Sequence, residues 1–418
     1  MNSNRRPTAP HVAPCSTRKR ARTLRRSIER RRHRLSAPSA YRPAASRSTY
    51  RANRGVTRGV YQLLRRARCR RVRCRRAAYT SFVDVHLAAV QVEWSPALYA
   101  SAGVFRERMV ALARAAVAEA GERPRLVVFP ELIGLPLLLT AAGDDEAVRA
   151  PDVVSALSRL ARRDAGRWLL TAWRTRRLGA SALYGTYAVA AFRMWHDAFA
   201  AAARASGAVV VAGSAFVPDV DEEPSRGWFV RDPSVNNATL TFAPSGRLLA
   251  RTAKIHLMPG AEQRAGLRCG RLDDLQVVAT AVGRVGVAVC LDGFHERVLS
   301  TLDGRGAQVV VQPSANDADW ERPWPPGPDR SEGEAWFDDG LRARIQARAS
   351  LRYGVNAMLV GDVLGLRPRG RSSIVANLVG AGALPPCVDD PRWPGVLASA
   401  PDAHSEAIVT ARVPHPGP

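Results

Sequence analysis

The feature that most restricts the possible folds of this chain is a series of short, almost uninterrupted apolar runs. Three examples are VHLAAVQV at residues 85–92, AVVVAGS at 208–214 and AQVVVQPSA at 307–315. A strand that faces water on one side alternates apolar and polar residues, whereas a strand covered on both faces reads as a continuous apolar run. The runs therefore predict buried strands, and other layers must cover both faces of the sheet that they form.

Helices connect some of these strands and hairpins connect others. Segment 101–121 places its apolar residues on one helical face, with a serine that can cap its start and a glycine that can end it. Segment 236–257 instead reads as a strand, a turn at 244–246 and a second strand. Helical crossovers join parallel strands and hairpins join antiparallel ones. The chain after residue 80 therefore predicts an α/β protein with mixed strand directions, which makes a simple doubly wound fold a poor match.

Charge divides the chain into two parts. Residues 1–80 contain 25 Arg or Lys side chains and a single acid, Glu29, whereas the rest of the chain carries 37 basic and 36 acidic side chains. Apolar residues are sparse in the first part and show little periodicity, so it is not expected to bury a core. We predict a disordered, arginine-rich extension over residues 1–80 and one folded domain over residues 81–418.

Several interpretations of the basic extension remain open. Arginine clusters bind nucleic acid or anionic membranes, and an arginine-rich, acid-poor start is also typical of an organelle transit peptide. Cys69 and Cys74 lack a second Cys or His pair at zinc-finger spacing, so no metal is expected there. The interpretation that we favour is an unstructured tail, or GC-rich sequence translated upstream of a misassigned start codon.

The cysteines and the hydropathy pattern bear on the cellular compartment. The six cysteines are scattered, which does not suit a disulfide framework and fits a reducing cytoplasm. No run of about 18 apolar residues suggests a transmembrane helix, and no charged start followed by an apolar core marks a secretory signal. We expect a cytoplasmic protein without a membrane partner.

Three chemically distinct side chains stand where buried strands are expected to end. Glu131 closes VVFPE, Lys254 lies in RTAKIHL, and Cys290 lies in GVAVCLDGF. Functional groups of α/β proteins commonly project from strand ends, and a carboxylate, an ammonium and a thiol form a coherent set for acyl transfer. Taken singly, each has a simpler explanation: Glu131 could be a loop acid, Lys254 a surface charge and Cys290 a buried core thiol.

Lys254 is unusual within its own chain. Only two of the 62 Lys and Arg side chains are lysine, Lys19 and Lys254. Arginine is a planar fork that stays protonated, whereas lysine is a compact point charge whose pKa burial can tune. A lysine in an arginine-rich domain is therefore a candidate site residue.

In their order and their flanking residues, these segments resemble the nitrilase superfamily, the carbon–nitrogen hydrolases. The resemblance runs from about Val85 to about Val379 and rests on VVFPE, GRLLARTAKIHLMPGAE, VGVAVCLDGF and VQPSA. It implies a four-layer α-β-β-α sandwich, usually assembled as a homodimer or a larger homo-oligomer. It also implies that residues 81–418 are a carbon–nitrogen hydrolase domain.

The resemblance implies a role for each candidate residue. Cys290 would be the nucleophile, Glu131 the general base and then acid, and Lys254 the group that stabilises the oxyanion. Glu262, the second glutamate of the family pattern, would help to position the substrate and the other three. The expected reaction is hydrolysis of a non-peptide carbon–nitrogen bond of a small amide, N-carbamoyl compound or nitrile. It would pass through a thioester-type intermediate and need no metal or organic cofactor.

The chain also departs from the family pattern. His295 stands where proline is common, so the specificity of other members is not carried over, and His295 itself reads as a helix-start or packing residue. Segments 137–185 and 316–340 are longer than the usual connections. The second holds Trp320, Trp324 and Trp336 and eight acids. It is either a lid or binding element for a cationic substrate, or a solvated surface loop.

Three other functions stay open at this point. The chain could transfer an acyl group to an acceptor other than water, or it could be a catalytically inactive scaffold with the same fold. It could also bind nucleic acid through residues 1–80. Salt-dependent binding that disappears with that segment would favour nucleic acid, and a thiol-directed probe would separate an active site from an inactive one.

Overall fold

The computed structural model describes residues 84–379 and 392–417, which belong to one compact unit, Ala78–Pro418. The predicted basic extension over residues 1–80, and with it the alternative of nucleic-acid binding, lies outside the described residues. No helix among the described residues has the length and apolar character needed to cross a bilayer.

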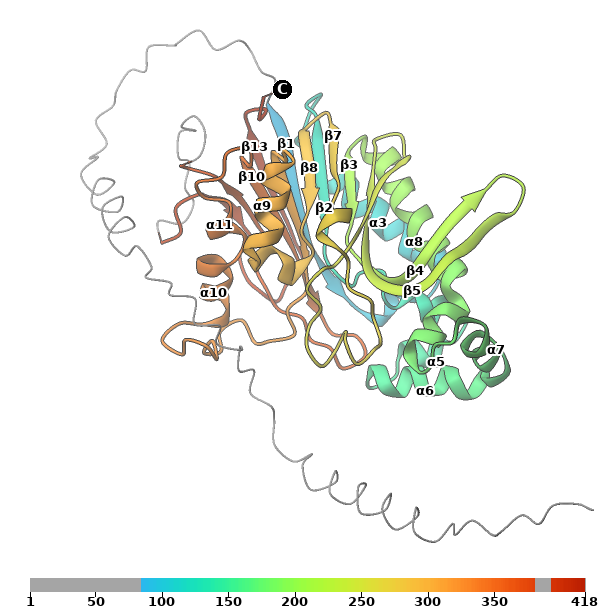
Figure 1. Ribbon diagram of the computed structural model, residues 1–418. Coiled ribbons are helices and arrows are strands. Elements are labelled where there is room, and N and C mark those ends of the chain that lie inside the picture. The colour runs from blue at the N-terminus through green and yellow to red at the C-terminus, as the bar shows by residue number, and fades with distance from the viewer. Residues whose placement is uncertain (1–83, 380–391, 418) are drawn as a thin grey trace, which may run out of the picture. The chain divides into compact units, whose positions relative to one another are not determined.

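The described residues form thirteen strands in one hydrogen-bonded network (Figure 1). The main path runs in the order β4-β5-β3-β2-β1-β10-β9-β8-β7, while β6 pairs with β5, β13 with β1, β11 with β10 and β12 with β11. The strands are β1 (Val85–Trp94), β2 (Arg125–Phe129), β3 (Val209–Ala212), β4 (Ala215–Glu223), β5 (Gly227–Phe242), β6 (Leu248–Ala253), β7 (Val277–Thr280), β8 (Gly283–Val287), β9 (Val309–Ser314), β10 (Tyr353–Gly361), β11 (Ser373–Ala376), β12 (Val396–Ser399) and β13 (Ala407–Val413).

Strand β1 joins two halves of this network. The part of β1 from residue 86 to 89 pairs with β2, whereas residues 92–94 at its far end pair with β10. The two halves turn toward each other, because side chains from β1, β2 and β3 share one buried cluster with side chains from β8, β9 and β10. The network is therefore a sandwich of two sheets joined along β1.

The two faces of β1 explain its uninterrupted apolar sequence. Val85, Leu87 and Ala89 lie in the core between the sheets. The alternate residues Val90 and Val92 lie in a second core, which includes side chains of the covering helices. Residues 85–92 of β1 are all buried, and the expectation of a strand covered on both faces is confirmed for this segment.

Helices cover the outer face of each sheet. The half that contains β2 packs against α3 (Ala102–Ala116) and α8 (Ala180–Ser206), whose aromatic residues share a core with it. The half that contains β9 packs against α9 (Glu296–Gly304), α10 (Glu332–Asp339) and α11 (Leu341–Arg344). The expected four-layer α-β-β-α sandwich is confirmed, and so are the mixed strand directions, since β1–β2 is parallel whereas β7–β8 is antiparallel.

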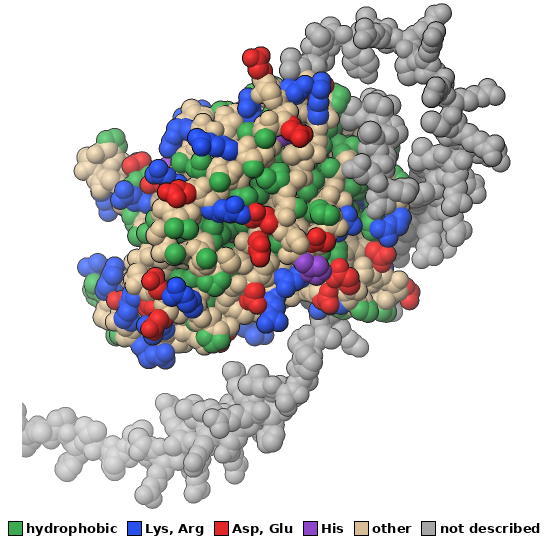
Figure 2. Space-filling model, turned by 180° about the vertical axis from the view of Figure 1, so that it is seen from behind, with side chains coloured by type: hydrophobic (Ala, Val, Ile, Leu, Met, Phe, Trp, Pro, Cys, Tyr) green, Lys and Arg blue, Asp and Glu red, His purple; other side chains and the backbone are tan. Residues whose placement is uncertain are grey.

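The longer connections differ in content. Segment 137–185 forms four short helices and the start of α8: α4 (Leu137–Ala142), α5 (Asp145–Val148), α6 (Val153–Arg163) and α7 (Ala165–Thr175). Segment 316–340 has one helix, α10, whose capping box is formed by Ser331 and Glu334. Three 3-10 turns complete the fold: η1 (Pro96–Tyr99), η2 (Leu272–Asp274) and η3 (Cys290–Phe294). The space-filling view shows basic and acidic side chains interspersed over one face of the molecule (Figure 2), in keeping with the near-balanced charge after residue 80.

The ends of β2 and β3 interlock just before and after Glu131. Leu132 N donates to Ser214 Oγ at 3.0 Å, and Gly134 N donates to the Ser214 carbonyl at 3.0 Å. Gly213 has φ +61°, and a Cβ on it would stand 2.0 Å from the Pro130 carbonyl oxygen. Only glycine fits this approach, which fixes the backbone that carries Glu131.

Gly213→Ala is expected to destabilise the domain much more than Gly207→Ala. Both glycines have φ +61°, so both substitutions cost about 1–2 kcal/mol for the left-handed backbone. Gly207 has open space at its Cβ position, whereas Gly213 meets the Pro130 backbone. Denaturant unfolding of the two variants measures the difference, and equal losses of unfolding free energy would contradict the interlock described above.

Candidate active site

The structure brings together the four residues that the sequence singled out. Glu131 follows the end of β2, Lys254 directly follows β6, and Cys290 begins η3 after β8. Glu262 lies in the turns that follow the lysine. All four are buried, with exposed fractions of 2% for Glu131, 1% for Lys254, 5% for Glu262 and 4% for Cys290. Residues as far as 159 positions apart in sequence therefore share one enclosed place.

The Lys254 ammonium lies between two carboxylates. Its Nζ is 2.8 Å from Glu131 Oε1 and 3.0 Å from Glu262 Oε2. A buried ion is costly unless it is paired and hydrogen-bonded. Here a single positive charge faces two carboxyl groups, so the cluster carries an excess of negative charge when both are ionised. That excess favours proton uptake by one of the carboxylates.

Asn237 on β5 completes this cluster, and the sequence analysis did not single it out. Its Nδ2 donates to Glu131 Oε1 at 2.8 Å and to Glu262 Oε1 at 2.6 Å. The backbone carbonyl oxygen of Asn237 accepts a hydrogen bond from the backbone N–H of Lys254 at 2.8 Å. One side chain thus holds both carboxylates while its backbone holds the lysine. The sequence offers one weak signal for this role: Asn237 is a polar residue within the predicted strand NNATLTF.

Backbone donors also bind the two carboxylates. Ala315 N donates to Glu131 Oε2 at 3.1 Å, and Met258 N donates to Glu262 Oε2 at 2.6 Å. These bonds fix the direction of each carboxylate. Ala315 ends the VQPSA segment that was part of the family resemblance, so that segment places a backbone donor at Glu131.

Cys290 sits at a sharp turn and in a strained backbone conformation. Its φ is 49°, in the left-handed region that non-glycine residues seldom adopt, and such strain costs about 1–3 kcal/mol. The thiol donates to the Ala315 carbonyl at 3.6 Å. Burial first, and then the charge of Glu131, raise the pKa of Cys290 well above its ordinary value. The resting group is therefore the thiol, which needs a base before it can attack.

The charges around Glu131 and Lys254 suit a base and a permanent cation. Burial is the main cause that raises the pKa of Glu131; Lys254 opposes it and the charge of Glu262 adds to it. Burial alone would lower the pKa of Lys254, but the charges of Glu131, Cys290 and Glu262 outweigh it and hold that pKa above its ordinary value. Glu131 thus binds a proton more readily than an ordinary carboxylate, while the ammonium stays charged.

Asp292 links the turn that carries Cys290 to the lysine segment. Its carboxylate, 1% exposed, accepts from Ile255 N at 2.9 Å and from His256 N at 2.8 Å. These two amides directly follow Lys254, so the carboxylate fixes the lysine segment against η3. Asp292 lies within VGVAVCLDGF, but the sequence alone does not indicate this role.

His295 behaves as the packing residue that was expected. It is the N-cap residue of α9 but makes no capping bond with its side chain. Its ring stacks on that of His256, with centroids 3.5 Å apart and planes 6° apart. Burial lowers the pKa of His295, and the neighbouring His256 adds to this effect. The stack is a second contact between the lysine segment and the segment that follows Cys290.

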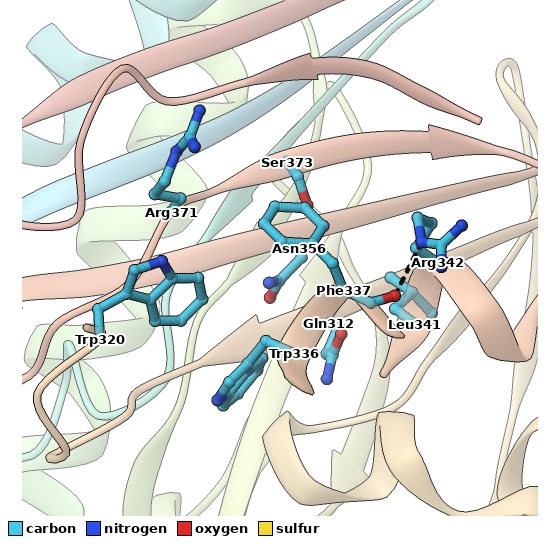
Figure 3. Close-up of a pocket in the computed structure, with 9 residues that line it drawn as sticks. All are labelled: Gln312, Trp320, Trp336, Phe337, Leu341, Arg342, Asn356, Arg371 and Ser373. Atoms are coloured by element: carbon cyan, nitrogen blue, oxygen red, sulfur yellow. Dashed lines mark hydrogen bonds between the residues drawn. The ribbon is translucent and has the colours of Figure 1, made fainter. Parts of the chain in front are cut away.

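A cavity lies beside the turn that carries Cys290, on the outer side of the half that contains β9 (Figure 3). Gln312 lines it and also donates from Nε2 to the Cys290 carbonyl at 2.7 Å. Segment 316–340 contributes Trp320, Trp336 and Phe337 to its wall. The other lining residues are Leu341, Arg342, Asn356, Arg371 and Ser373. The long loop therefore packs next to the segment that carries Cys290, while Glu131, Lys254 and Cys290 themselves do not line this cavity.

The arrangement contains the parts of a nucleophilic site. A thiol lies beside a carboxylate with a raised pKa, and a fixed ammonium lies beside that carboxylate. Such a set can move a proton and stabilise a developing negative charge. Within residues 84–379 and 392–417, no group of three or more His, Cys, Asp or Glu side chains could hold a metal ion.

Comparisons with known proteins agree with this geometry. The sequence model of the carbon-nitrogen hydrolase family matches residues 86–379, well over half of the chain. No curated protein matches the chain.

Solved structures that are similar to this one share little sequence identity with it. A carbon-nitrogen hydrolase from Helicobacter pylori G27 is 16% identical, with a TM-score of 0.51 over 80% of this chain and 89% of that one. An amidase from Nesterenkonia sp. is also 16% identical, with a TM-score of 0.48 over 81% of this chain and 94% of that one.

Lys254→Met is expected to destabilise the fold by about 3–5 kcal/mol at pH 7, because it leaves buried carboxylates without their counter-charge. Loss of the ammonium raises the pKa of Glu131 further above its unfolded value. The penalty is then full above the folded pKa and nearly lost at pH 4.5, where the folded carboxyl is protonated and the unfolded one is half protonated.

Unfolding free energies measured between pH 4.5 and 7 test this expectation. Arg251→Met is the matched control, since Arg251 lies on β6 and pairs with the partly exposed Asp219 at 2.7 Å. A loss in Lys254→Met that stays constant over this pH range would contradict the buried charge cluster.

Proposed function

Because the chain belongs to the carbon-nitrogen hydrolase family, we propose that it hydrolyses the carbon–nitrogen bond of a small amide, N-carbamoyl compound or nitrile with Cys290 as nucleophile. The observation that carries the proposal is the position of the Cys290 thiol beside a carboxylate that is itself paired with a buried lysine. A cysteine that served only to fill an apolar core would be packed among apolar side chains, without a carboxylate and an ammonium beside it.

The first half of the proposed reaction acylates the enzyme. Glu131 takes the thiol proton as Cys290 Sγ attacks the carbonyl carbon of an amide, and the carbon–oxygen double bond becomes an oxyanion. Lys254 stabilises that oxyanion, a contribution of about 3–4 kcal/mol for one well-placed donor. The oxyanion then collapses, the carbon–nitrogen bond breaks, and Glu131 returns its proton to the departing nitrogen. The products are ammonia or an amine, and a thioester on Cys290.

The second half releases the acid. Glu131, again ionised, takes a proton from water as the water oxygen attacks the thioester carbon. Lys254 stabilises the second oxyanion. The carbon–sulfur bond breaks, and the proton held by Glu131 returns to the thiolate of Cys290. The net reaction consumes one amide and one water and yields one carboxylic acid and one amine.

Glu262 and Asn237 act on this reaction through the other groups. Glu262 holds the second side of the Lys254 ammonium and adds a negative charge next to Glu131. Asn237 fixes the spacing between the two carboxylates. We assign both residues a positioning role, so that one ammonium faces the reacting carbon and one carboxylate faces the thiol.

Release of ammonia across a panel of small amides, N-carbamoyl compounds and nitriles tests the proposed function. Cys290→Ala is expected to abolish turnover, whereas Cys269→Ala, which removes an exposed free cysteine, should leave it unchanged. Intact-mass measurement of the wild-type chain with its best substrate should detect an acyl group on Cys290. Equal turnover in the wild type and Cys290→Ala would refute the proposal.

The pH dependence provides an independent test. Ionised Glu131 is the proposed base, and its pKa is raised, so kcat/KM should fall on the acid side with an apparent pKa above 4.5. The charge of Glu262 contributes to that raised value. Glu262→Gln should therefore move the acid limb to lower pH.

A second buried glutamate serves as the control for this shift. Glu332 is 4% exposed and pairs with Arg322 outside the cluster. Glu332→Gln should leave the acid limb in place. An acid limb that is the same in wild type and Glu262→Gln would show that Glu262 does not act on the base.

A further inference from the structure

Exposed apolar side chains are concentrated in one small part of the fold. Eight large apolar side chains are exposed among the described residues, and five of them lie between residues 154 and 178. Trp173 is 76% exposed and Leu178 is 81% exposed. The other three are Val154, Leu169 and Leu170. Single exposed apolar residues are ordinary, but a cluster of this kind marks an interaction surface.

Helix α7 is apolar on the side that faces away from the protein. Ala172 is its one buried residue, so the helix packs inward through a narrow contact. Trp173 lies three positions after Leu170 and four after Leu169, and residues at these spacings are neighbours on a helix, so the three exposed side chains share the outward side. A surface helix of a soluble protein normally turns its polar residues outward. Leu178 extends this surface just past the helix, and we name these four residues the α7 face.

The surroundings of the α7 face are strongly basic. Residues 153–178 contain seven arginines and a single acid, Asp164. That acid is already bound by Arg163 and Tyr187. Arg174 and Arg176, both exposed, form no ion pair with any described residue. Arg159 and Arg163 also pair with Asp144, whereas Arg174 and Arg176 do not, so apolar side chains and unbalanced positive charges meet beside the α7 face.

In contrast to the sequence-based expectation of no membrane partner, we propose that the α7 face docks on an anionic lipid bilayer. Tryptophan and leucine partition into the region between headgroups and acyl chains, and arginines at their edge complement anionic headgroups. Helix α7 has 11 residues, too few to span a membrane, so it would lie in the plane of the surface. Figure 1 shows α6 and α7 at one corner of the fold, away from α9, α10 and α11, where a flat surface can approach them.

A second copy of the chain fits this surface less well. A symmetric dimer brings the same patch of both copies together. The arginines beside one α7 face would then meet those beside the other, and like charges in a desolvated contact repel. An anionic bilayer presents the opposite charge and an apolar layer beneath it. This inference does not depend on the proposed hydrolase reaction.

Vesicle binding of the full chain tests the proposal. Residues 1–80 carry 25 basic side chains and would bind anionic lipid by charge alone, so binding is measured at about 0.5 M NaCl, where charges are screened beyond a few ångströms. Vesicles of equal parts phosphatidylglycerol and phosphatidylcholine should still sediment with the wild-type chain. The double variant Leu169→Ser with Trp173→Ser should bind at least about tenfold more weakly.

The controls separate insertion of the α7 face from other effects. Val104→Ser, which removes an exposed apolar side chain from α3, should bind like wild type. With brominated lipids, tryptophan emission should be quenched in wild type and in Trp228→Phe, but much less in Trp173→Phe. Circular dichroism of every variant confirms that it is folded.

Two outcomes would overturn the proposal. One is vesicle binding at high salt that is the same for wild type and the double variant, or absent from both. The other is a wild-type dimer that dissociates in the double variant, without vesicle binding, which would assign the α7 face to a second copy of the chain.

Discussion

The buried ion cluster of Lys254, Glu131 and Glu262 is the constraint on which the rest of the structure depends. Charges at 1–5% exposure are stable only when their partners are held in place. Those partners come from the ends of β2 and β6 and from the turns beyond β6, while Asn237 on β5 spans both carboxylates. The fold has to place these segments within hydrogen-bonding distance before the cluster can exist. The packing that joins the two sheets is therefore also the packing that assembles the charged groups of the site.

The same strand ends also carry backbone conformations that a free peptide would avoid. Cys290 and Leu132, which follows Glu131, both have positive φ. Such conformations persist only where the surroundings determine them. Gln312 holds the carbonyl of Cys290, and Ser214 holds the amide of Leu132. Strain and support therefore occur together at the proposed nucleophile and beside the proposed base, which keeps both side chains in fixed directions.

The resemblance to a known family predicted the fold and pointed to four candidate site residues whose roles remain proposals, and local signals supported it. Doubly covered strands read as apolar runs, and a lone lysine stands out among arginines. Asn237 and Asp292 could not be found in this way, because a polar residue that is buried beside a distant partner looks like any other polar residue in a single sequence. The pairing of β1 with β13 joins residues more than 300 positions apart, and nothing in either strand specifies the other. Long-range contacts of this kind are determined only by the assembled core.

Lysine usage has a practical consequence for the chemistry of this protein. Between residues 81 and 418 the chain contains one primary amine on a side chain, and it is 1% exposed and bound by two carboxylates. Acylating reagents, amine-directed crosslinkers and aldehyde fixatives therefore find no accessible lysine on the folded domain. Reaction at Lys254 would report that the cluster has opened. The arrangement makes this side chain a built-in reporter of local unfolding at the site.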